Sequence, residues 1–170
     1  MEDKNYLVKY ASLLGLYMGF FWIFKYLFIV FGGNNEYLSA LYMGFTAAVP
    51  IVAYRFTVIY REQTNKEAFS FFHAWQFGVL LYMFAAIIVS LVHLYYYKYV
   101  LGPEGVAEAM QQTLALLSSS GVNPAILKQA ETLTLTPLQM TVQDILSNTM
   151  AGAIFSIPVA LLAKRKTKLI

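Results

Sequence analysis

The sequence predicts an all-α integral membrane protein: a four-helix bundle of spanning helices, with an extramembrane helical hairpin between the third and fourth spans. Hydrophobic residues make up 59% of the 170-residue chain and charged residues only 12%, whereas roughly a quarter of a soluble domain is charged. Four long apolar stretches follow one another. The third is apolar on every helical face, whereas a soluble core helix shows a single stripe. A chain of this length predicts one transmembrane domain, residues 1–170.

Polar turns bound the first two spans. The first is predicted over about residues 10–31 and ends at the turn Gly32-Gly33-Asn34-Asn35, whose residues tolerate positive φ. It is longer than the apolar core of a signal peptide and no small-residue cleavage site follows it, which favours a retained helix. The second span is predicted over about residues 37–59 and contains Pro50, a kink that neighbouring helices can accommodate in lipid.

The third span, predicted over about residues 73–99, carries the longest apolar run. From Phe77 to Leu94 no side chain carries an obligate charge, and at about 1.5 Å per residue this run approaches the thickness of a bilayer core. The tyrosines that end the span are typical of an aromatic belt at a membrane interface. Ahead of the span, Thr64 and Glu67 fit a capping box, which predicts that the third helix begins there.

Residues from about 104 to 136 are predicted to form the helical hairpin. Val106, Met110, Leu114 and Leu117 recur at helical spacing and make one apolar stripe. A second short helix is expected after the serine-rich turn that follows, because an asparagine and a proline there are typical of a helix start. We expect the apolar side of this hairpin to rest on the mouth of the bundle or on the membrane surface.

The fourth span, predicted over about residues 137–163, begins at the clearest start signal in the chain. Thr136 is a typical N-cap, Pro137 fits the first helical position, and Gln139 completes a capping box. A cluster of basic residues follows the span.

The distribution of lysine and arginine predicts the orientation. Four spans place both termini on one side of the membrane, and nine basic residues fall on that side, against two on the other side and one within a span. The nine are Lys4, Lys9, Arg55, Arg61, Lys66, Lys164, Arg165, Lys166 and Lys168, and the two are Lys98 and Lys128. The positive-inside rule therefore places both termini in the cytoplasm and the hairpin outside.

The composition excludes several classes of site. Cysteine is absent, so the chain has no disulfide, thiol nucleophile or cysteine-ligated metal site. The two histidines, His73 and His93, stand twenty residues apart on one predicted helix, which separates them by about 30 Å and prevents them from sharing a metal. No motif for a nucleotide, a catalytic zinc or a nucleic acid is present. We therefore expect no metal, no cofactor, no nucleic-acid partner and no enzymatic activity.

Lys25 and Asp144 are ionisable residues inside predicted spans, where a charge is costly. Each lies about six residues from the outer end of its span, and His93 lies at a similar level, so the three could form one polar cluster. In the simplest interpretation the cluster is structural: Lys25 extends toward the interface, Asp144 pairs with it or with the backbone, and His93 forms a hydrogen bond with a carbonyl. The alternatives are a site that handles protons or ions and a small-ligand pocket beneath the hairpin.

Small residues recur at a spacing of four in three of the spans. The pairs are Gly15 and Gly19, Gly44 and Ala48, and Gly152 and Ser156. This spacing lets helix backbones approach each other closely in lipid. We interpret it as packing within the bundle, with a homo-oligomer face as the alternative.

Several stretches together resemble one known family. They are Phe77-Gly78 before the long apolar run, Tyr95-Tyr96-Tyr97-Lys98-Tyr99, the break at Gly102-Pro103, Thr136-Pro137, and the ending from Ala151-Gly152 through Ser156 to Ala163-Lys164-Arg165-Lys166. In these stretches the chain resembles the bacterial family of domain of unknown function 4199 (DUF4199), which usually has an aspartate where Gly102 stands. The resemblance implies a small four-span protein of the bacterial inner membrane. It brings no activity, cofactor or catalytic residue with it.

The sequence leads to two main hypotheses of function; a membrane enzyme that acts on lipid at the outer interface is a third, for which no nucleophile can be named. The first is a non-enzymatic accessory or structural subunit that packs with another membrane component, either a membrane protein partner or a second copy. It rests on the small-residue pairs and on the amphipathic hairpin. The second is a small transporter or channel that handles protons, ions or a small ligand through Lys25, His93 and Asp144.

Overall fold

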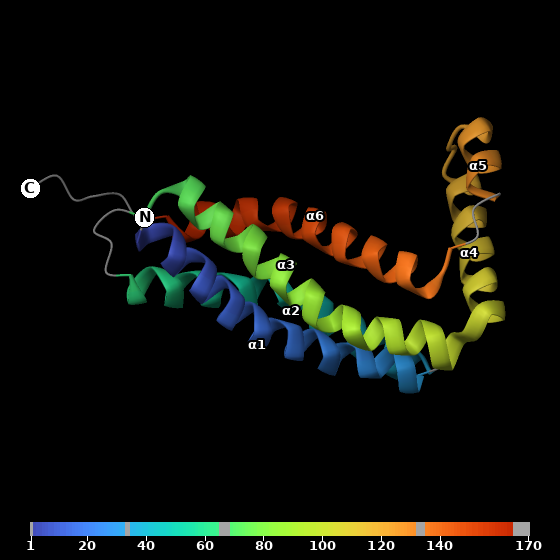
Figure 1. Cartoon of the computed structure of the whole chain (residues 1–170), viewed down its shortest axis with the longest axis horizontal. Coiled ribbons are helices and arrows are strands. Elements are labelled where there is room, and N and C mark those ends of the chain that lie inside the picture. The colour runs from blue at the N-terminus through green and yellow to red at the C-terminus, as the bar shows by residue number, and fades with distance from the viewer. Residues whose placement is uncertain (1, 33–34, 65–68, 132–134, 165–170) are drawn as a thin grey trace, which may run out of the picture. The chain divides into compact units, whose positions relative to one another are not determined.

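The structure of the protein is a computed structural model, and it describes residues 2–32, 35–64, 69–131 and 135–164. These residues are helical almost throughout (Figure 1). The helices are α1 (Glu2–Gly32), α2 (Glu36–Gln63), α3 (Phe71–Tyr95), the π-helical segment η1 (Tyr96–Leu101), α4 (Gly102–Ser119), α5 (Pro124–Glu131) and α6 (Pro137–Ala163). The chain divides into two compact units: unit 1 comprises residues 1–89 and 145–170, and unit 2 comprises residues 90–144.

Four helical stretches are long and apolar enough to cross a membrane: Tyr6–Gly32, Glu36–Gln63, Phe71–Ser119 and Pro137–Ala163. The third combines α3, η1 and α4, which follow one another without a gap in helical structure. The four predicted spans fall within these stretches. The all-α bundle with four candidate membrane spans is therefore confirmed.

Unit 1 is a bundle of α1, α2, the first part of α3 and the second part of α6 (Figure 1). Apolar side chains that recur every three or four residues along each helix form its core. On α1 these are Leu7, Ala11, Leu14, Met18 and Trp22, of which the most exposed is Leu7 at 9%. The regular spacing places one stripe of each helix against its neighbours.

The outer surface of unit 1 is also apolar. Met43, Ile51 and Leu162 are large hydrophobic residues that are 70%, 64% and 71% exposed. A soluble monomer rarely presents large contiguous apolar surfaces to water. The exposed apolar side chains therefore agree with helices that face lipid.

Four helix ends meet at one end of unit 1 (Figure 1). The rings of Tyr10, near the start of α1, and Tyr60, near the end of α2, are 5.7 Å apart. The Tyr60 hydroxyl lies 2.7 Å from Nε2 of His73, near the start of α3. Arg61 Nη1 donates a hydrogen bond to the carbonyl of Ala163, at the end of α6, at 2.9 Å. The start of α1 and the end of α6 thus share one end of the bundle, as an even number of crossings requires.

The capping box predicted at the start of α6 is confirmed. The Thr136 N–H donates to Gln139 Oε1 at 2.9 Å, and the Gln139 N–H donates to Thr136 Oγ1 at 3.3 Å. Each side chain satisfies one of the backbone donors that a helix start leaves unpaired.

The capping box predicted at Thr64 is wrong, because Thr64 ends α2 and does not begin α3. Its hydroxyl donates to the Tyr60 carbonyl at 3.0 Å; the other half of the predicted box, Glu67, lies outside the described residues. A threonine that bonds back to the preceding turn is not available to cap the next helix. The Ser70 hydroxyl performs that function, since it accepts the His73 N–H at 3.2 Å.

Unit 2 contains the last residues of α3, then η1, α4 and α5, and the first residues of α6. Gly102 has a φ of +66°, a conformation that side chains disfavour, and the chain leaves η1 there, at the break predicted from Gly102-Pro103. A second glycine of positive φ, Gly121 at +76°, follows the end of α4. The Asn123 side chain then accepts the Ala125 N–H at 2.9 Å and caps α5.

Candidate functional site

A hydrogen-bonded network of His93, Tyr97 and Asp144 lies in unit 2. His93 Nδ1 is 2.9 Å from Asp144 Oδ2, and the Tyr97 hydroxyl donates to the same oxygen at 2.7 Å. His93 lies on α3, Tyr97 follows it about one turn later on η1, and Asp144 comes from α6. The side chains of His93 and Asp144 are 12% and 30% exposed. The network is therefore partly buried, and Asp144 is the more exposed of the two side chains.

The carboxylate sets the roles of its two neighbours. An ionised aspartate only accepts hydrogen bonds, so His93 carries a proton on Nδ1 when it bonds to Asp144. Protonation of the second ring nitrogen would turn the hydrogen bond into an ion pair.

Lys25 is held in unit 1 by contacts with α1 and α2. Its Nζ donates to Thr46 Oγ1 at 3.1 Å, and it lies 5.5 Å from the ring centroid of Trp22 and 5.1 Å from that of Tyr42. The Thr46 hydroxyl in turn donates to the Tyr42 carbonyl at 2.8 Å. The hydroxyl and the faces of the two rings replace part of the hydration that an ammonium loses inside a span.

The structure thus brings together two residues of the predicted polar cluster, His93 and Asp144. Lys25 belongs to the other unit, so its ion pair with Asp144 stays a prediction. The sequence did not predict the role of Tyr97, which belongs to the tyrosines of the expected aromatic belt. Its spacing of four from His93 on one helix was the signal that could have identified it.

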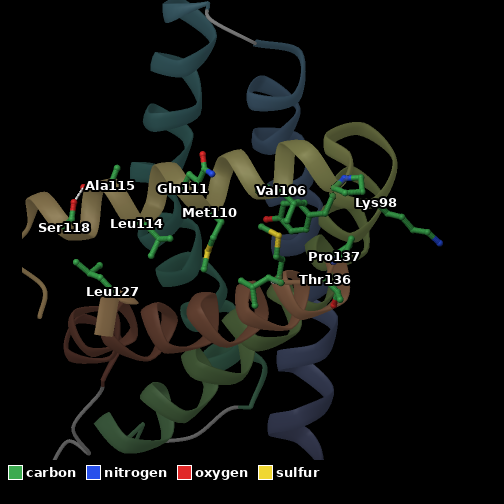
Figure 2. Close-up of a pocket in the computed structure, with 15 residues that line it drawn as sticks. Lys98, Val106, Met110, Gln111, Leu114, Ala115, Ser118, Leu127, Thr136 and Pro137 are labelled. Atoms are coloured by element: carbon green, nitrogen blue, oxygen red, sulfur yellow. Dashed lines mark hydrogen bonds between the residues drawn. The ribbon is translucent and has the colours of Figure 1, made fainter. Parts of the chain in front are cut away.

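Unit 2 also contains an open cavity of about 980 Å³ between α4, α5 and the segment that begins α6 (Figure 2). Its walls are mostly apolar, with large contributions from Val106, Met110, Leu114, Leu127, Leu135 and Met140. The predicted apolar stripe of α4 supplies the first three. Pockets for small molecules have volumes of about 300–1,000 Å³, so this cavity lies at the upper end of that range.

Polar residues reach the cavity from η1, from the cap of α6 and from α4, which contributes Gln111 and Ser118. Tyr97, Lys98 and Thr136 line it, and Figure 2 shows the Lys98 side chain extending away from the apolar wall. The Lys98 ammonium lies 5.0 Å from the ring centroid of Tyr99. Among the described residues that line the cavity, Lys98 is the one that carries a charge. Tyr97 connects the cavity to Asp144, because its hydroxyl belongs to the hydrogen-bonded network.

Two of the three small-residue pairs lie where α3 approaches another helix in unit 1. A Cβ on Gly15 would lie 2.6 Å from Phe84 Cβ, and a Cβ on Gly19 would lie 2.6 Å from Ile88 Cβ. On α6, Gly152 faces Tyr82 and Ser156 faces Gly78. The pair on α2 is different.

Gly44 is exposed, and a Cβ there would meet no described atom within 4 Å. Ala48, one turn later, is half-buried. Gly44 itself therefore makes no close helix contact within the described part of the chain.

The four apolar spans and the helical bundle define an all-α membrane protein. Within the described ranges, no three or more histidine, cysteine, aspartate or glutamate side chains gather where they could hold a metal ion. The family model described as "Protein of unknown function (DUF4199)" matches residues 13–165. The chain therefore belongs to the DUF4199 family, as its resemblance predicted. Comparison with curated proteins gave no match, and comparison with solved structures gave none.

Proposed function

We propose that this protein is a non-enzymatic accessory component of the bacterial inner membrane that binds another membrane component in the cavity of unit 2. The observation that carries the proposal is the cavity itself, an apolar space of about 980 Å³ that opens to the outside of unit 2. Apolar walls with a few polar groups at the edge are typical of binding sites.

The cavity is well placed to meet a membrane component. Its lining includes Pro137 and Met140, which belong to the first turn of α6, and α6 is one of the four candidate spans. The ends of spans lie at the membrane interface. With both termini in the cytoplasm, as the nine basic residues against two favour, this end of α6 and the cavity would face the outer side of the inner membrane.

Native mass spectrometry of the full chain, extracted from its own membranes with a mild detergent, tests the proposal. Ala107 and Ala115 line the cavity, and Ala107→Trp or Ala115→Trp would fill part of it. The matched control is Ala125→Trp, since Ala125 is exposed on α5 and does not line the cavity. We expect a bound component that both cavity variants lose and the control keeps. A component retained equally by all three variants, or no bound component, would overturn the proposal.

A second candidate function is proton or ion handling through the network of unit 2. The observation that favours it is the contact of His93 with Asp144 at 2.9 Å and of Tyr97 with the same carboxylate oxygen at 2.7 Å. Asp144→Asn should then abolish proton flux into liposomes, whereas Glu62→Gln, which changes an acidic side chain that is 64% exposed, should leave it intact. Equal flux in wild type and Asp144→Asn would remove this candidate.

A further inference from the structure

We propose that the cavity of unit 2 takes an acyl chain of an anionic phospholipid, with Lys98 at the level of the phosphate. This inference rests on the proposed function and names the membrane component that the cavity would bind. The residues that define it are the apolar wall of α4, the start of α6, and Lys98 at the edge.

The walls of the cavity fit a hydrocarbon chain. Val106, Met110 and Leu114 face it from successive turns of α4, and Leu127 faces it from α5 (Figure 2). Val106 and Leu114 lie at opposite ends of this wall. The cavity therefore follows about two turns of α4, or roughly 12 Å. Methionine and leucine walls of this kind bind flexible apolar chains because they adapt to shape and offer few hydrogen bonds.

The charge at the edge selects an anionic head group. Lys98 is one of the lining residues, and its side chain extends away from the apolar wall (Figure 2). A long basic side chain at a membrane interface buries its stem and keeps its charge among the head groups. Glu104 and Glu108 lie on the same helix as the wall but are not among the lining residues. Lys98 is therefore the charged residue of the described lining, and its positive charge is complementary to a phosphate.

The bilayer is the source of the ligand because the cavity includes the beginning of a candidate span. Thr136 and Pro137 line the cavity and begin α6, so a lipid beside α6 needs to insert only one chain. A membrane lipid is also present at high local concentration, so even weak binding would keep the site occupied.

The test uses the full chain, delipidated and reconstituted in nanodiscs with equal amounts of phosphatidylglycerol and phosphatidylethanolamine that carry identical acyl chains. The experiment is carried out twice, and in each run one of the two lipids carries a photoreactive group near the end of one acyl chain. We expect crosslinks to α4 at Met110 and Leu114 that are stronger with phosphatidylglycerol. Crosslinks to Ile51, which is 64% exposed on α2, report general contact with lipid and serve as the internal control.

Two kinds of variant separate the acyl chain from the head group. Ala115→Trp and Ala107→Trp should reduce the α4 crosslinks about ten-fold or more, since overfilling a packed site costs about that factor in binding, while Ala125→Trp leaves them unchanged. Lys98→Gln should lower the preference for phosphatidylglycerol about five-fold, the effect of one basic residue near an anionic membrane surface. Lys128→Gln, which removes a basic residue outside the lining, should preserve it.

The outcomes distinguish this inference from the proposed function. If native extraction yields a cavity-dependent component but the α4 crosslinks are absent or insensitive to Ala115→Trp, the acyl-chain assignment is wrong and the proposed function stands. If the crosslinks depend on the cavity but Lys98→Gln does not change the preference between lipids, the assignment of an anionic head group is overturned. If neither measurement depends on the cavity, both proposals are wrong.

Discussion

Alanine at Gly15 and alanine at Gly44 should change the stability of unit 1 in opposite directions. A Cβ at Gly15 would lie 2.6 Å from Phe84 Cβ and 3.1 Å from the Leu81 carbonyl oxygen. Both atoms are fixed to the backbone of α3, so no rotamer change can relieve the overlap and the helices must separate. At Gly44 a Cβ would meet no described atom within 4 Å.

The magnitudes follow from two opposing effects. Overfilling a packed interior costs about 1–3 kcal/mol, whereas alanine is favoured over glycine inside a helix by about 1 kcal/mol. Taking the middle of the first range, Gly15→Ala should lower the free energy of unfolding by about 1 kcal/mol. Gly44→Ala incurs no overlap and should raise it by about 1 kcal/mol. The two variants should therefore differ by about 2 kcal/mol.

The free energy of unfolding can be measured for the full chain in detergent micelles, by titration with a denaturing detergent while helicity is followed by circular dichroism. Gly15→Leu enlarges the overlap and should lower the free energy of unfolding further than Gly15→Ala does. Gly44→Leu should not lower it. Equal shifts of the same sign for Gly15→Ala and Gly44→Ala would refute the reasoning that α1 and α3 are held together through Gly15.

Two further substitutions, one on η1 and one at the start of α6, can be tested with the same titration. Tyr97→Phe removes the hydroxyl that donates to Asp144 at 2.7 Å and should cost about 1.5 kcal/mol, as for other hydrogen bonds to a charged group; Tyr99→Phe, at a residue that is 64% exposed, should cost nothing measurable. Thr136→Ala removes the capping hydroxyl of α6 and should cost about 1 kcal/mol, whereas Thr113→Ala, at an exposed position inside α4, should not destabilise; equal effects of the two threonine variants would argue against the cap.

The spans and the start of α6 could be predicted from sequence because their signals are local. Long apolar runs need no knowledge of the partner helix, and the capping box of Thr136 and Gln139 closes within one turn. The same motif failed at Thr64, where the hydroxyl bonds to Tyr60 in the preceding turn. A threonine hydroxyl can bond to the last turn of the preceding helix or to the first turn of the following one, and the local sequence does not decide between the two.

The cavity of unit 2 could be anticipated only as an alternative. The stripe of Val106, Met110 and Leu114 predicted that one face of α4 would be covered. How completely α5 covers that face depends on the turn between the two helices, where Gly121 has a φ of +76°. These are tertiary features, and an amphipathic pattern is the same whether its apolar face is filled by the protein or left for a ligand.

The contacts of Lys25 include neighbours that depth along a span does not reveal. Depth along the span placed Lys25 level with Asp144, but the choice between neighbours also depends on how each helix is rotated. The observed contacts of Lys25 are with Thr46 at 3.1 Å and with the rings of Trp22 and Tyr42. Trp22 is one turn away on the same helix, a spacing that the sequence does reveal. Thr46 and Tyr42 form a second such pair, spaced by four on α2. A lysine with an aromatic at i−3, facing a threonine with an aromatic at i−4, is therefore a pattern by which two neighbouring spans can hold an ammonium with a hydroxyl and two rings.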